Sequence, residues 1–483
     1  MPSEPPSEPT RKTPTRAVNW DDFREHIATA DKDGHRRWLY PKKPSGRWYR
    51  WRTGFSWALI FIMFVGPFVR IQGNPLLMFN IVERKFSILG QIFWPEDTII
   101  FAVAMLTFFA GIMIFTTAFG RLWCGWACPQ TVMMEMVFRK IEYLIEGDSH
   151  EQRALDQAPW NRAKVFKKAM KHAVFFGLSF VVGNTLLAYI IGTEALFQII
   201  TDDPRQHLTG LTFMVLFTLI FYGIFARFRE QACTFICPYG RFQSALLDEN
   251  TMVVAYDHKR GEQRGPWKRD QRLELRQAEG LGDCVNCRQC VAVCPTGIDI
   301  RNGVQMECVH CTACIDACDT VMDKVGRPRG LIRYASLNGI EHGQPLRFTA
   351  RMKLYATVLT GLVSLFLVLV FTRADVETMF LRAPGSLFQT AADGRISNLY
   401  TVKVVNKTGK DLPLKFRLDD IDGQVSIMGA AEFVVPQQQL RQASVLIGLQ
   451  PSQLKGPNTP LTIGVYSGDR RIETVKTSFV GPR

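Results

Sequence analysis

The sequence predicts a multi-domain membrane protein with five transmembrane α-helices, an inserted cysteine-rich domain and a C-terminal β-sandwich. Three observations predict this fold class. Long apolar stretches without charged residues recur five times, all twelve cysteines fall between Cys124 and Cys318, and the end of the chain alternates between apolar and polar side chains. A chain of 483 residues is long enough for two or three domains.

The transmembrane prediction rests on five stretches of 17 residues or more without Asp, Glu, Lys, Arg or His. They are Thr53–Val69, Thr98–Gly120, Ala173–Thr193, Leu208–Ala226 and Leu354–Thr372. A helix rises about 1.5 Å per residue and the hydrocarbon core is about 30 Å thick, so about 20 apolar residues cross it. The first stretch contains Pro67 and extends through Arg70 and Ile71 if that arginine reaches the lipid headgroups. Buried helices of a soluble enzyme are the alternative.

Lys and Arg counts predict the orientation, because cytoplasmic loops are enriched in these residues. Residues 1–52, 121–172 and 227–353 contain 12, 9 and 19 of them, whereas the loops 70–97 and 194–207 contain 3 and 1. The first three segments are therefore expected on the cytoplasmic side, and five spans then place the C-terminal domain in the periplasm. The formal charge of +14 follows from this bias. It predicts contact with anionic membrane lipid and requires no nucleic-acid partner.

The cysteines agree with this topology. Residues 373–483, predicted to lie outside, contain none of the twelve. Reduced thiols and metal ligands belong in a reducing compartment, so the distribution argues against a disulfide framework. The first 16 residues are rich in Pro, Ser and Thr and are predicted to be disordered, and we recognise no cleavable signal peptide.

The predicted domain order follows from these features. It comprises a cytoplasmic N-terminal segment (1–52), a four-helix membrane block (53–253), a charged linker (254–280), the cysteine-rich domain (281–330), the fifth transmembrane helix (354–372) and a periplasmic β-domain (397–483). Short alternating strands are expected at 399–405, 414–418, 443–447, 461–466 and 473–479, with turn signals between them. Such a pattern is typical of an immunoglobulin-like β-sandwich.

The membrane block contains an internal repeat. The second and fourth spans each lead into a Cys-x-x-x-Cys-Pro motif, with Cys124 and Cys128 in the first and Cys233 and Cys237 in the second. Two spans per unit return the chain to the same side, so both cysteine pairs are expected on one face. Each pair lies either on a continuous helix, where positions i and i+4 share a face, or on a turn, because Pro129 and Pro238 suit the first turn of a new helix.

Four interpretations of these four cysteines are open. They can form a thiolate site for Cu(I), a redox-active dithiol, or a cluster site shared by both pairs. The fourth is simple packing, since free cysteine is commonly buried. Seven methionines can line a copper route or simply pack: Met63, Met105, Met113, Met133, Met134, Met136 and Met214.

The densest cysteine region has the spacing of a bacterial ferredoxin that holds two [4Fe–4S] clusters. Two runs of Cys-x-x-Cys-x-x-Cys-x-x-x-Cys occur, at Cys284, Cys287, Cys290 and Cys294, and at Cys308, Cys311, Cys314 and Cys318. In two-cluster ferredoxins the fourth cysteine of each run binds the other cluster. We therefore predict one cluster on Cys284, Cys287, Cys290 and Cys318, and a second on Cys294, Cys308, Cys311 and Cys314. Paired Cys-x-x-Cys motifs that bind zinc are the alternative.

The histidines are not expected to bind a cofactor. His310 lies between two predicted ligands and is expected at the surface. His172 and His207 are expected at opposite edges of the membrane, so they cannot be axial partners on one haem, and no haem is expected.

The motifs resemble those of one family. Trp123–Val132, Cys233–Gln243 and Cys308–Asp319 are similar to the CcoG (FixG/RdxA) family of cytochrome c oxidase accessory proteins, which are membrane-bound polyferredoxins. The similarity extends over nearly the whole chain from about residue 35. The family also has Asp after the last cysteine, as Asp319 follows Cys318 here, where ferredoxins usually carry proline.

The resemblance implies a bacterial inner-membrane protein that acts in the assembly of a cbb3-type oxidase. It implies cupric reductase activity, with Cu(II) reduced to Cu(I) for the oxidase copper site. By the resemblance, the eight ferredoxin cysteines pass electrons, while Cys124, Cys128, Cys233 and Cys237 are the candidate copper or redox residues. The implied partners are oxidase subunits, or a copper transporter or chaperone. The electron donor is unknown, and a homodimer is left open.

Two other functions remain open. One is a quinol dehydrogenase subunit similar to the NapH-like membrane ferredoxins of nitrate respiration, although that relative usually lacks the fifth span and the β-domain. The other is a non-catalytic assembly scaffold whose β-domain binds oxidase subunits.

Overall fold

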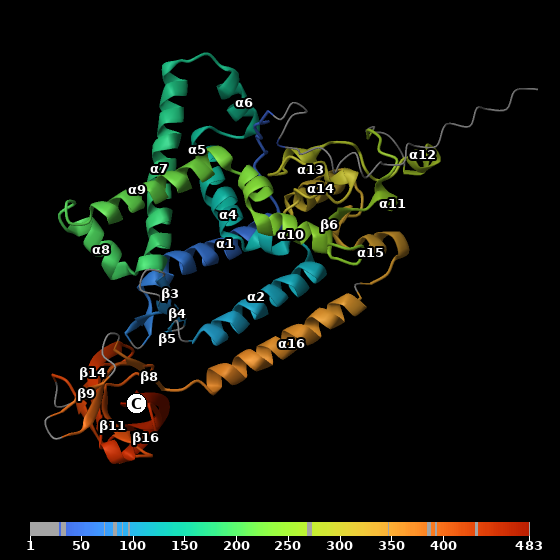
Figure 1. Cartoon of the computed structure of the whole chain (residues 1–483). Coiled ribbons are helices and arrows are strands. Elements are labelled where there is room, and N and C mark those ends of the chain that lie inside the picture. The colour runs from blue at the N-terminus through green and yellow to red at the C-terminus, as the bar shows by residue number, and fades with distance from the viewer. Residues whose placement is uncertain are drawn as a thin grey trace, which may run out of the picture. The chain divides into compact units, whose positions relative to one another are not determined.

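A computed structural model describes residues 29, 35–71, 73–80, 85–88, 90–94, 97–267, 273–345, 347–383, 388–391, 394–429 and 433–482 (Figure 1). The expected disorder of residues 1–16 lies outside these ranges. The chain forms two compact units. One comprises residues 1–69, 78–83 and 101–364, and the other comprises residues 70–77, 84–100 and 365–483.

Five helices in the described residues are long and apolar enough to cross a membrane, which confirms the five predicted spans. They are α1 with the short helix η1 (Arg47–Val65 and Gly66–Phe68), α2 (Thr98–Phe119), α7 (Arg162–Ile191), α9 with the π-helical turn η4 (Leu208–Gly223 and Ile224–Phe228), and α16 (Ala350–Phe371). The first, third and fifth helices begin before the apolar stretches do, because basic and aromatic residues such as Arg47, Trp48 and Lys164 add turns at that end. α7 packs against α9, where Gly183 brings its backbone to the Thr218 Cα.

Short helices carry and follow each Cys-x-x-x-Cys-Pro motif. After α2 they are α3 (Leu122–Trp126), α4 (Pro129–Val132), the π-helix η3 (Met133–Phe138), α5 (Arg139–Ile145) and α6 (Ser149–Gln157). α8 (Thr193–Thr201) joins α7 to α9, and η5 (Ala232–Ile236) and α10 (Pro238–Leu246) follow α9. Asp148 begins α6 with a capping box in which Glu151 returns a hydrogen bond to the Asp148 backbone. Phe138, Phe175 and Phe225 form part of the apolar core of the membrane block.

The cysteine-rich domain is built on a two-stranded antiparallel sheet. β6 (Val253–Tyr256) pairs with β7 (Ile332–Ala335), and all of β6 except Val253 lies in the segment predicted to be linker. The helices between these strands are α11 (His258–Gly261), α12 (Leu273–Ala278), α13 (Gln289–Ala292), η6 (Ile300–Asn302) and α14 (Ala313–Lys324), and α15 (Leu337–His342) follows β7. Val254, Ile300, Ile315 and Leu331 are buried together with several of the cysteines. The sheet and α14 therefore form the platform that carries the sulfur atoms.

The second unit contains the β-sandwich, and all five predicted strands are present. One sheet has the order β12 (Gly423–Ile427), β14 (Leu440–Leu449), β10 (Ile396–Asn406), β8 (Val376–Arg382), with β9 (Gln389–Thr390) also on β10. The other has the order β13 (Phe433–Val435), β11 (Leu412–Leu418), β15 (Asn458–Ser467), β16 (Arg470–Val480), and η7 (Pro451–Gln453) precedes β15. Alternate residues of each strand, such as Tyr400, Val402 and Val404, fill the core between the sheets.

Short strands also occupy the loop between the first two spans, where none were predicted. They are β1 (Arg70–Ile71), β2 (Asn74–Pro75), β3 (Leu77–Asn80), β4 (Lys85–Ile88) and β5 (Gln91–Phe93). Within the second unit, Asp97 at the end of this loop binds Lys407 of the sandwich at 2.7 Å and also forms an ion pair with Arg373. The loop is therefore attached to the sandwich by buried charges.

Candidate metal centres

The first predicted ligand set lies around one pocket. Cys284, Cys287, Cys290 and Cys318 all line it, with Met322, Leu331 and Ile332 among the apolar residues that complete the wall. Cys290 lies on α13 and Cys318 on α14, whereas the other two cysteines lie on the loop that leads into α13. Cys287 is exposed, while Cys284 and Cys290 are buried. The fourth cysteine of the second run therefore joins the first three of the first run.

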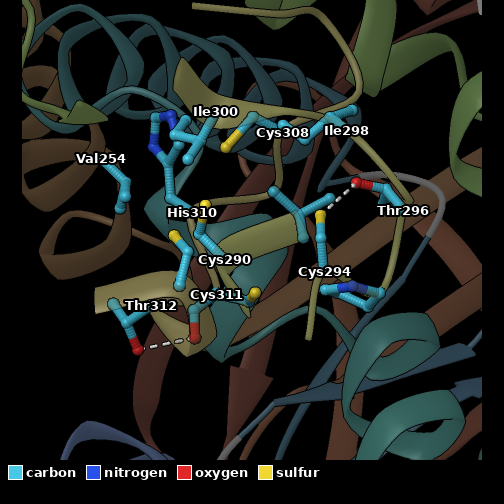
Figure 2. Close-up of a pocket in the computed structure, with 13 residues that line it drawn as sticks. Val254, Cys290, Cys294, Thr296, Ile298, Ile300, Cys308, His310, Cys311 and Thr312 are labelled. Carbon is cyan, nitrogen blue, oxygen red and sulfur yellow. Dashed lines mark hydrogen bonds between the residues drawn. The ribbon is translucent and has the colours of Figure 1, made fainter. Parts of the chain in front are cut away.

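The second predicted set lies around another pocket, shown in Figure 2. Cys294, Cys308, Cys311 and Cys314 line it, and Cys290 of the first set lines it as well. Figure 2 shows Cys294 hydrogen-bonded to Thr296, a contact of 3.4 Å. The crossing of the fourth cysteines between the two sets is the arrangement that the ferredoxin spacing predicts.

Both runs use the same unusual backbone. In the first run Asn286 and Arg288 have positive φ angles of 54°, and at the same positions of the second run His310 and Thr312 have 53° and 66°. Residues other than glycine rarely adopt this left-handed conformation, and where they do it is often at a functional site. The repeated turns curve each Cys-x-x-Cys-x-x-Cys segment around its pocket.

The residues at both pockets fit iron–sulfur clusters. Burial raises the pKa of the Cys290 and Cys308 thiols to about 12. Buried thiols of this kind are neutral without metal, and binding to iron removes their protons. Each thiolate of a cubane binds a different iron, so its ligands surround a volume rather than one point. Within the described ranges, no group of three or more His, Cys, Asp or Glu side chains could hold a single metal ion.

His310 is buried, so the prediction that it lies at the surface was wrong. Only 1% of the side chain is exposed, and its Nδ1 accepts a hydrogen bond of 3.1 Å from the Arg121 backbone N–H. Burial, together with the Arg121 charge, lowers the pKa of His310 to about 3. A Cβ added to Gly120 would lie 2.7 Å from the His310 ring. His310 therefore docks the ferredoxin-like domain on the turn after α2, a contact that no local sequence pattern indicates.

The two Cys-x-x-x-Cys-Pro motifs lie on turns. Cys124 is in α3 and Cys233 in η5, whereas Cys128 and Cys237 are the N-cap residues of α4 and α10. Pro129 and Pro238 begin these new helices, where a missing backbone N–H costs nothing. Each motif therefore ends one helix and begins another.

The structure gathers all four of these cysteines into what we call the sulfur quartet, Cys124, Cys128, Cys233 and Cys237. The thiols interact electrostatically across the two motifs, with Cys233 near the other three and Cys124 near Cys128 and Cys237. Burial raises the pKa of Cys124 to about 11, although Arg121 opposes this, and raises that of Cys233 to about 12. The Cys124 thiol donates a hydrogen bond of 2.9 Å to Gln243 Oε1.

The sulfur quartet adjoins the second ligand set. Cys124, Val309 and Cys311 belong to one buried apolar cluster. A Cβ added to Gly125 would lie 2.2 Å from the Val309 carbonyl oxygen, so the two backbones meet where only glycine fits. Trp126 Nε1 donates to the Tyr334 hydroxyl, which in turn donates to the His310 carbonyl, both at 3.2 Å. The membrane block and the ferredoxin-like domain are therefore fixed together at this junction.

Buried ion pairs join the two repeats behind the sulfur quartet. Arg229, which begins the second motif, binds both carboxylate oxygens of Glu142 on α5 at 3.0 and 2.8 Å. Lys171 on α7 lies 3.4 Å from the same carboxylate. Burial favours the neutral acid, but Arg229 and Lys171 lower the pKa of Glu142 to about 2. The pairs hold the second motif against the first.

A pocket opens beside Cys233. It is lined by Met134, Glu135 and Glu230 of the membrane block and by Pro295, Thr296 and Val309 of the ferredoxin-like domain, among others. Of the seven methionines highlighted in the sequence, Met134 lines this pocket. Met133, Met134, Met136 and Met214 are all buried, and Met133 and Met134 belong to the apolar core of the membrane block.

Comparisons with known proteins agree with this geometry. A 4Fe-4S dicluster domain family matches residues 228–337, a 4Fe-4S binding domain family matches residues 101–145, and the Ig-like fold at the C-terminus of FixG matches residues 366–482. The chain thus contains two iron–sulfur domains that support bound clusters, and an Ig-like domain.

Curated relatives match most of the chain. Protein RdxA of Cereibacter sphaeroides is 35% identical over 82% of this chain and 86% of its own length. Nitrogen fixation protein FixG of Rhizobium meliloti is 32% identical over 92% of this chain and 89% of its own length. A crystal structure of a FixG-related protein from Vibrio parahaemolyticus is 20% identical and covers 22% of this chain and 95% of that one, with a TM-score of 0.19 that carries no weight for the fold.

Proposed function

Because this chain belongs to the FixG/RdxA family, we propose that it is a membrane-bound electron-transfer protein that reduces Cu(II) to Cu(I) during assembly of a cbb3-type cytochrome c oxidase. The observation that carries the proposal is the sulfur quartet beside the second ligand set, where Cys124 and Cys311 share one apolar cluster. Clusters bound by the eight ferredoxin cysteines would supply single electrons. Cu(II) takes up one such electron and becomes Cu(I), and a reduced electron carrier of the cell restores the electron to the protein.

The chemistry of the quartet suits the product of this reaction. Cu(I) is a soft ion that prefers thiolate and thioether ligands, and each motif of the quartet offers a pair of thiolates. The high pKa values of Cys124 and Cys233, about 11 and 12, mean that these thiols give up protons when the metal binds. Copper binding should therefore strengthen as the pH rises. Met134 lines the adjacent pocket with Cys233, which adds a soft donor on the way to the quartet.

We also propose a membrane, an orientation and a side for the partners of this protein. The Lys and Arg counts support a bacterial inner membrane with the ferredoxin-like domain in the cytoplasm and the Ig-like domain in the periplasm. The Ig-like domain then faces the side on which oxidase subunits, or a copper transporter or chaperone, would meet it.

The test is a single-turnover assay on the purified full chain. The protein is reduced with dithionite, freed of excess reductant and mixed with Cu(II) and a chromogenic Cu(I) chelator. Replacing Cys233 and Cys237 together by Ser should abolish Cu(I) formation while the iron content stays unchanged. Phe235→Leu, an exposed change in the same turn, is the matched control and should reduce copper normally. Undiminished reduction by the double variant would remove these cysteines from the mechanism.

A second candidate is electron transfer without copper, in which the sulfur quartet holds a third cluster. It is favoured by the match of a 4Fe-4S binding domain family to residues 101–145, a range that contains Cys124 and Cys128 but none of the eight ferredoxin cysteines. Iron analysis separates the two candidates. Two clusters give about eight iron atoms per chain and three give about twelve. A loss of about four iron atoms in the Cys233 and Cys237 double variant would favour the third cluster.

A further inference from the structure

A buried arginine reaches the second ligand set from the first transmembrane helix. Arg52 on α1 is 2% exposed, and its Nε donates a hydrogen bond of 2.7 Å to the Gly125 carbonyl. Its Nη2 is buried without a hydrogen-bond partner among the described residues. The Gly125 backbone meets the second run, because a Cβ added to it would lie 2.2 Å from the Val309 carbonyl oxygen and 3.0 Å from the His310 carbonyl oxygen. Arg52 therefore lies beside the segment that carries Cys308 and Cys311, and its charge opposes the effect of burial on the pKa of the Cys311 thiol.

A second buried arginine approaches from the turn after α2. Arg121 is 4% exposed, and its side chain donates to the Met306 carbonyl while its backbone N–H donates to His310. Its Nε is likewise buried without a partner in the described part of the chain. The Arg121 charge acts on both Cys124 of the quartet and Cys308 of the second set. Two guanidinium groups thus lie at the junction where the quartet meets the second set.

The carboxylate that faces Cys311 is compensated. Glu135 forms an ion pair of 2.5 Å with the buried Arg139. Glu307 precedes Cys308 in the chain and is buried as well, so Arg121 acts on Cys308 beside one neighbouring carboxylate. Arg52 acts on Cys311, where the facing carboxylate is already paired.

The first ligand set has a different environment. Arg301 acts on Cys290, but it is paired with Asp299 through contacts of 2.8 and 2.6 Å, and that carboxylate acts on Cys290 as well. Asp319 adds a negative charge next to Cys318. Arg301 is thus neutralised by its own partner, whereas Arg288 lines the same pocket and the buried Arg276 donates a hydrogen bond of 3.1 Å to the Cys284 carbonyl.

We propose that Arg52 and Arg121 are positioning residues that raise the reduction potential of a cluster bound by Cys294, Cys308, Cys311 and Cys314. An electron added to a thiolate-bound cluster makes an anionic group more negative, and burial alone opposes this. Fixed positive charges in a site of low dielectric offset that cost. The two arginines thereby favour the reduced state of the cluster next to the sulfur quartet. The inference requires bound clusters but does not depend on copper reduction.

The test is a redox titration of the full chain, followed by EPR without copper. Arg52→Gln should shift one of the two midpoint potentials negative and lower the ratio of reduced to oxidised cluster at fixed poise about tenfold, which for a one-electron couple is about 59 mV. Asp319→Asn should shift the other midpoint positive, which identifies the first set. Arg50→Gln removes the same charge from an exposed position two residues away and should leave both midpoints unchanged.

Conservative variants separate charge from packing. Arg52→Lys keeps the charge and should retain most of the wild-type potential, and the pair Arg121→Lys and Arg121→Gln repeats the comparison at the second position. Equal shifts in the Lys and Gln variants, or no shift in either Gln variant, would overturn the proposal. Because no copper is present, a wild-type protein that fails to reduce Cu(II) would contradict the proposed function and leave this result intact.

Discussion

Replacing Glu142 by Gln is expected to destabilise the junction of the two repeats. Glu142 binds the Arg229 guanidinium through both oxygens and also contacts Lys171, and all three side chains are buried. Glutamine leaves Arg229 with Glu230 alone, at 3.7 Å. A buried charge that loses its partner keeps the cost of its removal from water. The loss should loosen the turn that carries Cys233.

The magnitude follows from the shifted pKa of Glu142. Its drop from 4.5 to about 2 corresponds to about 3 kcal/mol of unfolding free energy, because one pKa unit is worth about 1.4 kcal/mol. Breaking a buried ion pair by removing one partner typically costs about 3–5 kcal/mol. We therefore expect Glu142→Gln to lose about 3 kcal/mol. Since the folded pKa lies below the unfolded one, this stabilisation is complete above about pH 4.5 and is lost as the pH falls toward 2.

The assay is denaturant unfolding of the full chain in detergent, combined with thiol labelling of the apo protein. Asp323→Asn is the matched control, because Arg329 binds Asp323 in the same two-bond geometry, at 2.7 and 2.8 Å, on an exposed surface. The control should unfold like the wild type. The reasoning is refuted if Glu142→Gln also unfolds like the wild type, or if its stability keeps the acid dependence of the wild type between pH 4.5 and 2.

Two further predictions concern the ligand sets and the β-sandwich. Cys318→Ser should remove or alter the cluster of the first run. A redox titration followed by EPR should then still show the midpoint potential that shifts in Arg52→Gln, and loss of that midpoint would contradict the crossing of the fourth cysteines. Asp97→Asn should lower the unfolding temperature of the full chain at neutral pH, because Lys407 and Arg373 lose their shared carboxylate. Burial opposes ionisation of Asp97, but these two cations hold its pKa below 3.8. The difference in unfolding temperature between variant and wild type should therefore shrink as the pH falls below that value, and a constant difference would argue against the ion pairs.

The amino-acid sequence alone determined the elements whose signals are local. The five spans follow from uncharged stretches matched to the thickness of the bilayer, and the strands of the sandwich from alternation along residues such as Tyr400–Val404. The ferredoxin-like motifs follow from gaps of two residues between cysteines, because that spacing wraps one chain segment around one cluster. In each case the residues that act together are close in the chain.

The short strands were not predicted, because their signals are too weak within each segment. β1 to β5 have two to four residues each, too few to show a period of two, and β8 lies before the range in which alternation was recognised. The loop that contains β1 to β5 is held by contacts with residues far away in the sequence, such as the ion pair of Asp97 with Lys407. Propensity within so short a segment is weaker than the contacts that the rest of the fold supplies.

Only the tertiary structure decided how the chemical groups meet. Cys124 and Gln243 are 119 residues apart, and Arg121 and His310 are 189 apart, yet each pair is hydrogen-bonded. In the sequence Arg52 was only one of the 12 basic residues counted before the first span, and His310 was predicted to lie at the surface. Their burial depends on packing between the membrane block and the ferredoxin-like domain. Such contacts join side chains that are far apart in the sequence and follow no regular spacing there. They could not be predicted, because only the folded structure determines which of these side chains meet.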